Sequence, residues 1–299
     1  MSSPARLFLA PSFLFLFLAF LPALHAEEKA ILLTDDVQLK VADAFMAEGE
    51  FYRAITEFKK FLILFPDSDK ADYALFTIGV AYYKGEEYAA AARTLASLQE
   101  KYPESANLLQ ARYLEGFSFW KLKNYEKARA TFEALADTYH ESEYAPRALV
   151  ASSLVALDAD RAGISRDGLE RFVRQYPDDP RLENVREAMA LLDEYQDLPQ
   201  KSPVLAGVMS AIIPGSGYMY AGHYGDGITA FLINGLFIAG TITGINQENY
   251  AVGAIVGGIG LPFYFGNIYG SANAAKKWNL GVRDQLRNKI HIALAPFFK

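Results

Sequence analysis

The sequence predicts an all-α protein, a solenoid of helical hairpins followed by a small transmembrane helical domain. Three observations lead to this prediction. The first two thirds of the chain repeat with a period of 37 residues, the composition changes sharply after residue 198, and residues 203–275 carry only two charged side chains, Asp226 and Glu248. We therefore expect a signal peptide at 1–26, a solenoid at 27–198, a hydrophobic membrane domain at 199–280 and a basic tail at 281–299.

The first segment has the features of a secretory signal. Arg6 supplies a positive charge, residues 7–24 are almost wholly apolar, and Ala26 precedes a charged stretch. This order of charge, apolar run and small residue is typical of export signals. An uncleaved N-terminal anchor is the alternative, and in both cases the following residues are exported. Because the chain has no cysteine, we expect neither a lipidated N-terminus nor disulfides nor thiolate metal sites.

The 37-residue period is marked by an aromatic residue that is usually followed by proline. The pairs are Phe65-Pro66, Tyr102-Pro103, Tyr139-His140 and Tyr176-Pro177. Small residues keep the same spacing in the first half of the units (Ala42, Gly79, Gly116), and alanines keep it in the second half (Ala54, Ala91, Ala128). We expect each unit to be two amphipathic helices in close contact, with proline ending the second. The repeats lie at about 35–68, 72–105, 109–142 and 146–179, followed by a cap helix at 181–196.

This order of small residue, aromatic, alanine, aromatic and proline resembles the tetratricopeptide repeat (TPR) family over residues 35–180. The period exceeds the usual 34 residues, as in the longer repeats of envelope proteins such as the BamD outer-membrane assembly factor and the Tol–Pal coordinator. The resemblance implies a concave groove lined by the first helix of each repeat. It places partner-binding side chains at Tyr73, Phe76, Tyr83, Tyr113, Phe117 and Trp120. Packing between repeats is the alternative role for these aromatics.

Three apolar stretches follow the repeats, at 204–220, 228–245 and 251–269, and the second has about the length needed to span a bilayer. Basic residues gather just beyond the last stretch: Lys276, Lys277, Arg283, Arg287 and Lys289. Basic flanks stay on the cytoplasmic side of a membrane. With the repeats exported, this predicts three crossings and a tail on the opposite side from the repeats. The Pro-Gly-Ser-Gly at 214–217 leaves a re-entrant or broken first helix as the alternative.

The segment around 214–234 resembles a TM2-like, glycine-rich hairpin membrane domain of uncharacterised role that occurs beside TPRs in bacteria. The residues that carry the resemblance are Pro214, Gly215, Gly217, Tyr220, Gly222, Asp226 and Asn234. We expect Asp226 to cap a helix beginning at Gly227, with a functional role inside the bilayer as the alternative. Pairs with G-x-x-x-G spacing (240/244, 253/257 and 266/270) predict tight helix packing, within the domain or between copies of a homo-oligomer.

Composition and motifs narrow the function. A net charge of -6 argues against nucleic-acid binding. The four histidines have no ligand spacing, and no nucleotide-binding or hydrolase motif is present, so we predict no metal, no cofactor, no catalytic residue and no enzyme. We expect a periplasmic TPR scaffold anchored in the inner membrane, in contact with lipid, that binds protein or peptide partners in cell-envelope assembly or maintenance.

The alternative is an oligomeric pore or lipid-handling protein with a TPR collar. Outer-membrane residence is favoured less, because one short alternating segment at 290–294 cannot close a barrel.

Overall fold

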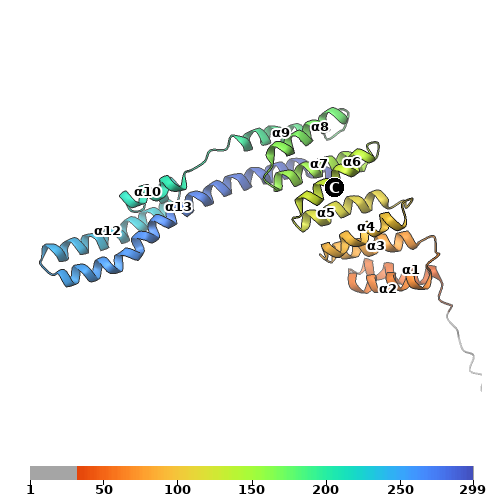
Figure 1. Ribbon diagram of the computed structural model, residues 1–299, viewed down its shortest axis with the longest axis horizontal. Helices are drawn as coiled ribbons and strands as arrows, with labels where there is room; N and C mark the ends of the chain where they lie inside the picture. Colours follow the sequence, from red (N-terminus) through yellow and green to blue (C-terminus); the bar gives the residue numbers. More distant parts are fainter. Residues whose placement is uncertain (1–31, 299) are drawn as a thin grey trace, which may run out of the picture.

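The computed structural model describes residues 32–298, so the expected signal peptide lies outside the described residues. Within this range the chain folds into α-helices joined by short turns, with no strand (Figure 1). This confirms the all-α prediction for the part of the chain that the structure describes.

Eight helices form four consecutive antiparallel hairpins, and a ninth follows them (Figure 1). They are α1 (Asp35–Ala47), α2 (Phe51–Leu64), α3 (Ala71–Lys84), α4 (Tyr88–Lys101), α5 (Leu108–Lys121), α6 (Tyr125–Thr138), α7 (Tyr144–Asp158), α8 (Ala162–Gln175) and α9 (Leu182–Gln196). We refer to α1–α9 as the solenoid.

The backbone of the turn inside each hairpin repeats with the same 37-residue period as the side chains. One residue in each turn has a left-handed conformation: Gly49, Glu86, Lys123 and Asp160, with φ between 57° and 78°. The amide that follows it donates to a carbonyl five residues earlier, as from Glu87 to Tyr82 at 2.9 Å. This bond is the signature of a Schellman helix end, and it turns every first helix toward its partner in the same way.

Small residues in the first helices let large side chains of the second helices approach. A Cβ placed on Gly79 would lie 2.5 Å from Leu95, and one on Gly116 would lie 2.6 Å from Phe132. Leu95 and Phe132 have no exposed surface, and each comes four residues after the repeat alanine. In the solenoid core, large apolar side chains of the second helices therefore pack against glycines of the first helices, which have no side chain.

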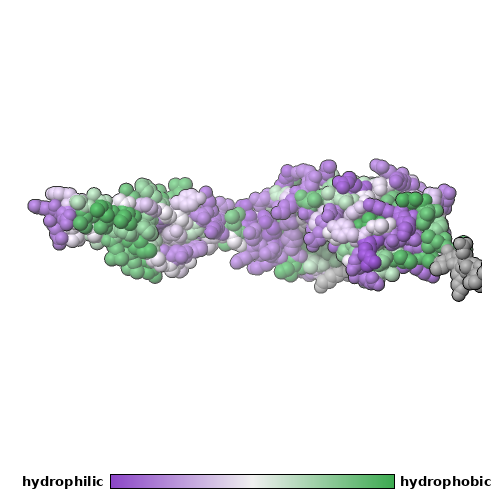
Figure 2. Space-filling view, turned by 90° about the horizontal axis from the view of Figure 1, so that it is seen from below, coloured by the Kyte–Doolittle hydropathy of each residue, from purple (hydrophilic) through white to green (hydrophobic). Residues whose placement is uncertain are grey.

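The rest of the chain forms an apolar helical hairpin with a shorter helical turn beside it (Figure 1). Its elements are α10 (Pro203–Ile212), α11 (Ser216–Tyr220), α12 (Tyr224–Asn246), α13 (Tyr250–Leu294) and a final 3-10 turn, η2 (Ala295–Phe298). By length and composition, α12 and the helical stretch 250–298 could each cross a membrane. Figure 2 shows apolar side chains gathered on this part of the surface. We refer to 203–275 as the hairpin domain.

The helix α10 is too short to span a bilayer, because ten residues rise only about 15 Å. It runs antiparallel to α13, with Ala206 beside Ser271 and Ser210 beside Asn267, and α11 then leads back toward Ser202. The apolar stretch at 204–220 is thus a broken helix that returns to its own starting end, which was the alternative left open by the sequence.

The position of the tail contradicts one prediction. The helix α13 continues without a break past Lys276, and its last turns lie along α9 and α7 of the solenoid (Figure 1). A tail in contact with the repeats cannot lie across a membrane from them, so the three-crossing arrangement is wrong. Arg283 and Arg287 of the tail instead make ion pairs with Asp160 of the solenoid. We refer to residues 281–298 as the C-terminal segment.

Candidate functional site

The aromatic side chains predicted on α5 lie together on one face of that helix. The rings of Tyr113 and Phe117 are 4.9 Å apart and edge-on, and Phe117 stacks on Trp120 at 5.6 Å. All three also contact Phe132 of the neighbouring α6. The repeat pattern brings these rings together because they occupy one face of α5, at spacings of four and three residues.

The C-terminal segment fills this aromatic groove. Phe297 is fully buried and meets the ring of Phe172 edge-on at 5.2 Å. The guanidinium of Arg181 lies 4.1 Å from the centre of the Phe297 ring. Phe298 approaches Phe117 at 5.8 Å. The C-terminal segment of the chain therefore occupies the aromatic surface of the third and fourth repeats of the same molecule.

Polar contacts fix the register of this docked segment. The carboxylate of Asp158, at the end of α7, accepts from Trp120 Nε1 at 2.8 Å and lies 2.9 Å from Nε2 of His291. The His291 ring also stacks on Trp120 at 6.0 Å. This half-buried carboxylate can hold the C-terminal segment in one axial position, because a shift by one helical turn would break the contact between His291 and Asp158.

A second carboxylate repeats this arrangement nearby. Asp160 accepts from Arg283 Nη1 at 2.8 Å and from the Tyr195 hydroxyl at 2.8 Å. Arg287 in turn donates to the Tyr195 hydroxyl at 3.2 Å. Burial, together with the bond to Asp160, raises the pKa of Tyr195. Two acids at the end of α7 thus fasten the C-terminal segment to the solenoid.

The six predicted partner-binding residues separate into three environments. Phe117 and Trp120 contact the C-terminal segment, whereas Tyr113 is half-buried beside them. Phe76 is only 7% exposed and packs within the repeats, which was the alternative role. Tyr83 is half-buried against Tyr88, and Tyr73 is 37% exposed with its hydroxyl donating to Asp43 at 2.9 Å. Partner binding by these side chains stays a prediction.

The docking of the C-terminal segment was not predicted, although the sequence carries a signal for it. The buried residues are Leu286, Ile290, Ala293, Leu294 and Phe297. Their spacing of four, three, one and three residues marks one face of a helix. Over the five residues 290–294 alone the pattern looks alternating, and the helical face becomes apparent only over all twelve residues from 286 to 297.

In the hairpin domain, the predicted glycines allow contact between backbones. Gly215 has φ +87°, and a Cβ on it would lie 2.0 Å from the carbonyl oxygen of Gly227. A Cβ on Gly217 would lie 1.9 Å from the carbonyl oxygen of Ala206. No side chain can be added at either position, because the atom it would meet belongs to the main chain.

Uncharged polar side chains hold this turn in place. Asn267 accepts from the Gly215 amide at 2.9 Å and donates to the Ser210 carbonyl at 3.0 Å. The Ser210 hydroxyl accepts from the Gly217 amide at 3.0 Å, and Ser271 donates to the Ala206 carbonyl at 3.1 Å. Two of these bonds give partners to amides at the break between α10 and α11, those of Gly215 and Gly217.

The other motif residues lie around this turn. Pro214 is half-buried before Gly215, Gly222 has φ +89°, and the Tyr220 hydroxyl accepts from the Ser202 amide at 3.0 Å. Asn234 is 3% exposed and donates to a carbonyl of its own helix, from Nδ2 to Ala230 at 2.8 Å.

Asp226 does not cap a helix at Gly227, which corrects the prediction. The helix α12 begins earlier, at Tyr224, with His223 as the residue before it. Asp226 lies in the first turn of α12, 3.3 Å from His223 Nδ1, where its charge favours the amino end of the helix.

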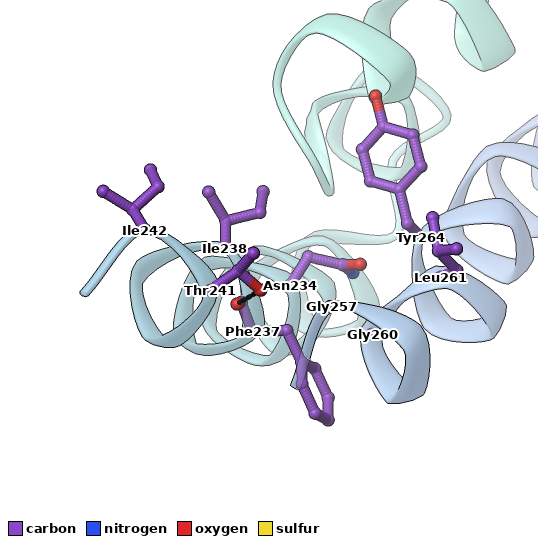
Figure 3. Close-up of a pocket in the computed structure, with 9 residues that line it drawn as sticks. All are labelled: Asn234, Phe237, Ile238, Thr241, Ile242, Gly257, Gly260, Leu261 and Tyr264. Atoms are coloured by element: carbon purple, nitrogen blue, oxygen red, sulfur yellow. Dashed lines mark hydrogen bonds between the residues drawn. The ribbon is translucent and has the colours of Figure 1, made fainter. Parts of the chain in front are cut away.

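An apolar groove of about 290 Å³ lies between α12 and α13, beyond the end of α10 (Figure 3). It is lined by Asn234, Phe237, Ile238, Thr241, Ile242, Gly257, Gly260, Leu261 and Tyr264. Its polar groups are engaged elsewhere: the Thr241 hydroxyl donates to the Phe237 carbonyl, and the Tyr264 hydroxyl donates to the Ala211 carbonyl. The groove offers no charged group to a ligand.

The part of the chain that the structure describes has no cluster of metal-ligating side chains. Between residues 32 and 298, no group of three or more histidines and carboxylates could hold a metal ion. Asp35 and Asp36 lie in the first turn of α1, and a bond from Lys70 lowers the pKa of Asp36. Asp179 accepts from Arg181, which lowers the pKa of its carboxyl group.

Fold and site together define a helical-repeat protein whose groove holds its own C-terminal helix. A family described as an outer membrane lipoprotein family, YfiO, matches residues 40–123, and the tetratricopeptide repeat family matches residues 110–142. The chain is therefore a TPR-repeat protein, as the repeat pattern predicted.

Two solved structures are similar over most of the chain. The structure of pilF from Pseudomonas aeruginosa is 15% identical, the match covers 80% of this chain and 96% of that one, and the TM-score is 0.41. A tetratricopeptide repeat protein from Parabacteroides merdae is 11% identical, with coverages of 80% and 98% and a TM-score of 0.44. A comparison with curated proteins finds no match.

Proposed function

We propose that this chain is a TPR scaffold of the cell envelope, with its repeats in the periplasm and α12 and α13 in the inner membrane. The similarity of residues 40–123 to an outer membrane lipoprotein family supports an envelope role. The repeats supply protein-binding surface and the hairpin domain supplies anchorage, so no catalytic group is required of either.

The docked C-terminal segment is the observation that carries this proposal. Its apolar face lies in an aromatic groove with Phe297 fully buried, which is the helix-in-groove mode of recognition. The solenoid can therefore hold a helical ligand. Because its own segment already occupies the third and fourth repeats, partners bind the first and second repeats, with Tyr73 and Tyr83 on α3 of the second.

Lipid exposure of the hairpin domain is supported by which side chains it leaves outside. Leu236, Ile255 and Phe265 are 62–75% exposed, whereas Asn234, Asn267 and Ser271 are at most 4% exposed. A domain with large apolar side chains outside and small or polar ones inside suits lipid and not water. The 23 residues of α12 rise about 34 Å, enough to cross a hydrocarbon core.

The orientation follows from two crossings. Both ends of the α12–α13 pair lie on the side of the repeats, and the connecting residues 247–249 lie at the far end (Figure 1). Lys201, Lys276 and Lys277 flank the repeat side, so the charge rule alone would put the repeats in the cytoplasm. We give precedence to the N-terminal export signal, since the first targeting segment usually sets orientation.

Cysteine labelling tests this orientation, and the chain has no cysteine of its own. Ile292 is 73% exposed on the C-terminal segment, and Glu248 lies at the far tip. With a membrane-impermeant maleimide added to spheroplasts, we expect Ile292→Cys to react and Glu248→Cys to react only after the membrane is opened. The reverse result would place the repeats in the cytoplasm.

Photocrosslinking tests the scaffold role. A photoreactive amino acid replaces Tyr73 on α3, and in a matched strain it replaces Tyr52, which is 61% exposed on α2. We expect discrete protein adducts from position 73 that are absent from position 52. Equal adducts from both positions, or none from either, would contradict partner binding through the first two repeats.

A further inference from the structure

A second cavity lies where the solenoid joins the hairpin domain. It has a volume of about 320 Å³ and lies between the connector 198–200 and one face of α13. Its lining residues are Leu198, Pro199, Gln200, Lys276, Asn279, Leu280 and Arg283. Lys276 and Arg283 lie two helical turns apart on α13, with Leu280 between them, so two cations border an apolar floor.

The connector is held firmly beside this cavity. The side-chain amide of Asn279 donates to the Lys201 carbonyl at 2.9 Å and accepts from the Lys201 amide at 2.8 Å. The ammonium of Lys201 lies 4.2 Å from the centre of the Trp278 ring and 6.0 Å from that of Tyr220. A third cation is thus fixed over aromatic rings next to the first two.

These cations have little negative charge to balance them. Among the residues that the structure describes, Lys201, Lys276 and Lys277 make no ion pair, and Arg283 pairs with Asp160 through Nη1 alone. A guanidinium has five N–H donors, so Arg283 keeps donors for a further acceptor. The chemistry of the cavity is that of a site for an anion with an apolar part.

The cavity also lies at the level where lipid head groups would be. Trp278 and Tyr220 lie beside Lys201 and Ser202, where the connector from the solenoid enters the hairpin domain, and Trp and Tyr are enriched at membrane interfaces. In Figure 2, apolar surface gives way to hydrophilic surface between the hairpin domain and the solenoid. An anion available at this level, with an apolar part attached, is the phosphate of a phospholipid.

We propose that this cavity binds the phosphate group of an anionic phospholipid, with Lys276 and Arg283 on the phosphate and Lys201 as an adjacent cation. The proposal rests on the membrane placement of the hairpin domain proposed above. A net anionic lipid is favoured over a zwitterionic one, because no carboxylate lines the cavity to receive a positively charged head group.

Tryptophan fluorescence tests the proposal. The chain has two tryptophans, so in the full-length Trp120→Phe protein Trp278 is the sole emitter. The protein is placed in nanodiscs of equal phosphatidylglycerol and phosphatidylcholine, with bromine on the acyl chains of one lipid at a time. We expect stronger quenching by brominated phosphatidylglycerol, and equal quenching by the two lipids once Lys276 and Lys201 are replaced by glutamine. Lys289→Gln, an exposed cation further along α13, should keep the preference.

The remaining outcomes separate the site from the membrane placement. Equal quenching by both lipids in the parent protein would overturn the lipid site and leave the anchoring intact. Quenching by neither lipid would overturn both. Loss of the phosphatidylglycerol preference on adding inorganic phosphate would mean that the cavity takes free phosphate instead of lipid. Because Trp120 touches the C-terminal segment, native mass spectrometry of the unaltered protein serves as a second measurement, with retained phosphatidylglycerol expected.

Discussion

The solenoid and the α10–α11 turn of the hairpin domain use glycine in different ways. In the solenoid, Gly79 and Gly116 make room for side chains, since a Cβ would meet Leu95 or Phe132. At the α10–α11 turn, Gly215 and Gly217 make room for main-chain carbonyls, whereas Gly260 and Gly270, elsewhere in the hairpin domain, face the side chains of Phe237 and Tyr218. The proposed membrane placement of the hairpin domain accounts for this difference. Water rewards the burial of large apolar side chains, whereas in lipid association depends on close backbones and polar bonds.

The comparison also extends to what lies inside each part. Buried residues of the solenoid include Phe58, Leu95 and Phe132, whereas those of the hairpin domain are small or uncharged polar residues such as Ser210 and Asn267. The hairpin domain therefore inverts the burial pattern of the solenoid, which agrees with its proposed place in a membrane. This inversion leads to four predictions, from the largest expected effect to the smallest.

The first prediction concerns the docked C-terminal segment, which, like the solenoid, buries a large apolar side chain. Replacing Phe297 by alanine removes a fully buried ring and should lower the free energy of unfolding of the solenoid by about 3–5 kcal/mol. Denaturation of the detergent-solubilised protein, followed by circular dichroism, measures this. The neighbouring Phe298→Ala, at 36% exposure, should cost far less; equal losses would mean that the segment is not docked in solution.

The second prediction tests the backbone contact of the hairpin domain. A methyl group at Gly217 would meet the Ala206 carbonyl oxygen, which no rotamer change can move, so Gly217→Ala should cost more than about 3 kcal/mol. Limited proteolysis in detergent should then cut near the α10–α11 turn. At Gly266 a Cβ meets nothing within 4 Å, and the matched Gly266→Ala should leave the digest unchanged. Identical digests for the two variants would refute the contact.

The third prediction is that substitution of a solenoid glycine costs less stability than substitution of Gly217 in the hairpin domain. A methyl group at Gly79 meets the end of the Leu95 side chain, which can shift, so Gly79→Ala should cost about 1–3 kcal/mol. The midpoint of chemical denaturation measures it, with Gly163→Ala as the control because nothing lies within 4 Å there. If Gly79→Ala proved as costly as Gly217→Ala, the contrast between the two parts would not hold.

The fourth prediction concerns a carboxylate that the solenoid tolerates. Burial raises the pKa of Glu115, which accepts from Gln99 at 2.6 Å. A raised pKa in the folded state means that ionisation costs stability as pH rises above the unfolded value near about 4.3. Glu115→Gln keeps an acceptor for Gln99 and should stabilise by less than about 1 kcal/mol at pH 7. The gain should vanish below about pH 4; a constant difference across pH would exclude a charge effect.

The sequence predicts the solenoid well because every landmark recurs. Phe58, Leu95, Phe132 and Leu169 are spaced by 37 residues, and all four are fully buried. A position that is expected to be buried in one repeat can therefore be compared with the equivalent position in the next repeat. This comparison needs no knowledge of contacts between distant parts of the chain. The helical class of the apolar region followed in the same way from its length and lack of charge.

The site could be predicted only in part. The motif glycines were identified, but Asn267, which bonds to Gly215, lies 52 residues away and has no local pattern of its own. The docking of His291 on Asp158 joins residues 133 positions apart. Both contacts depend on how helices that are distant in the sequence pack against each other. No single stretch of sequence encodes that packing. The tail was placed across the membrane because its charges were considered without their partners.

The docking of Phe297 has a consequence for biosynthesis. The groove that it fills is complete once residue 196 has been made, yet its occupant is among the last residues of the chain. At about 5–20 residues per second, roughly a hundred further residues take about 5–20 s to synthesise. During that interval Phe117, Trp120 and Phe172 lack their contacts with the C-terminal segment, so the unfinished polypeptide exposes more apolar surface than the complete one.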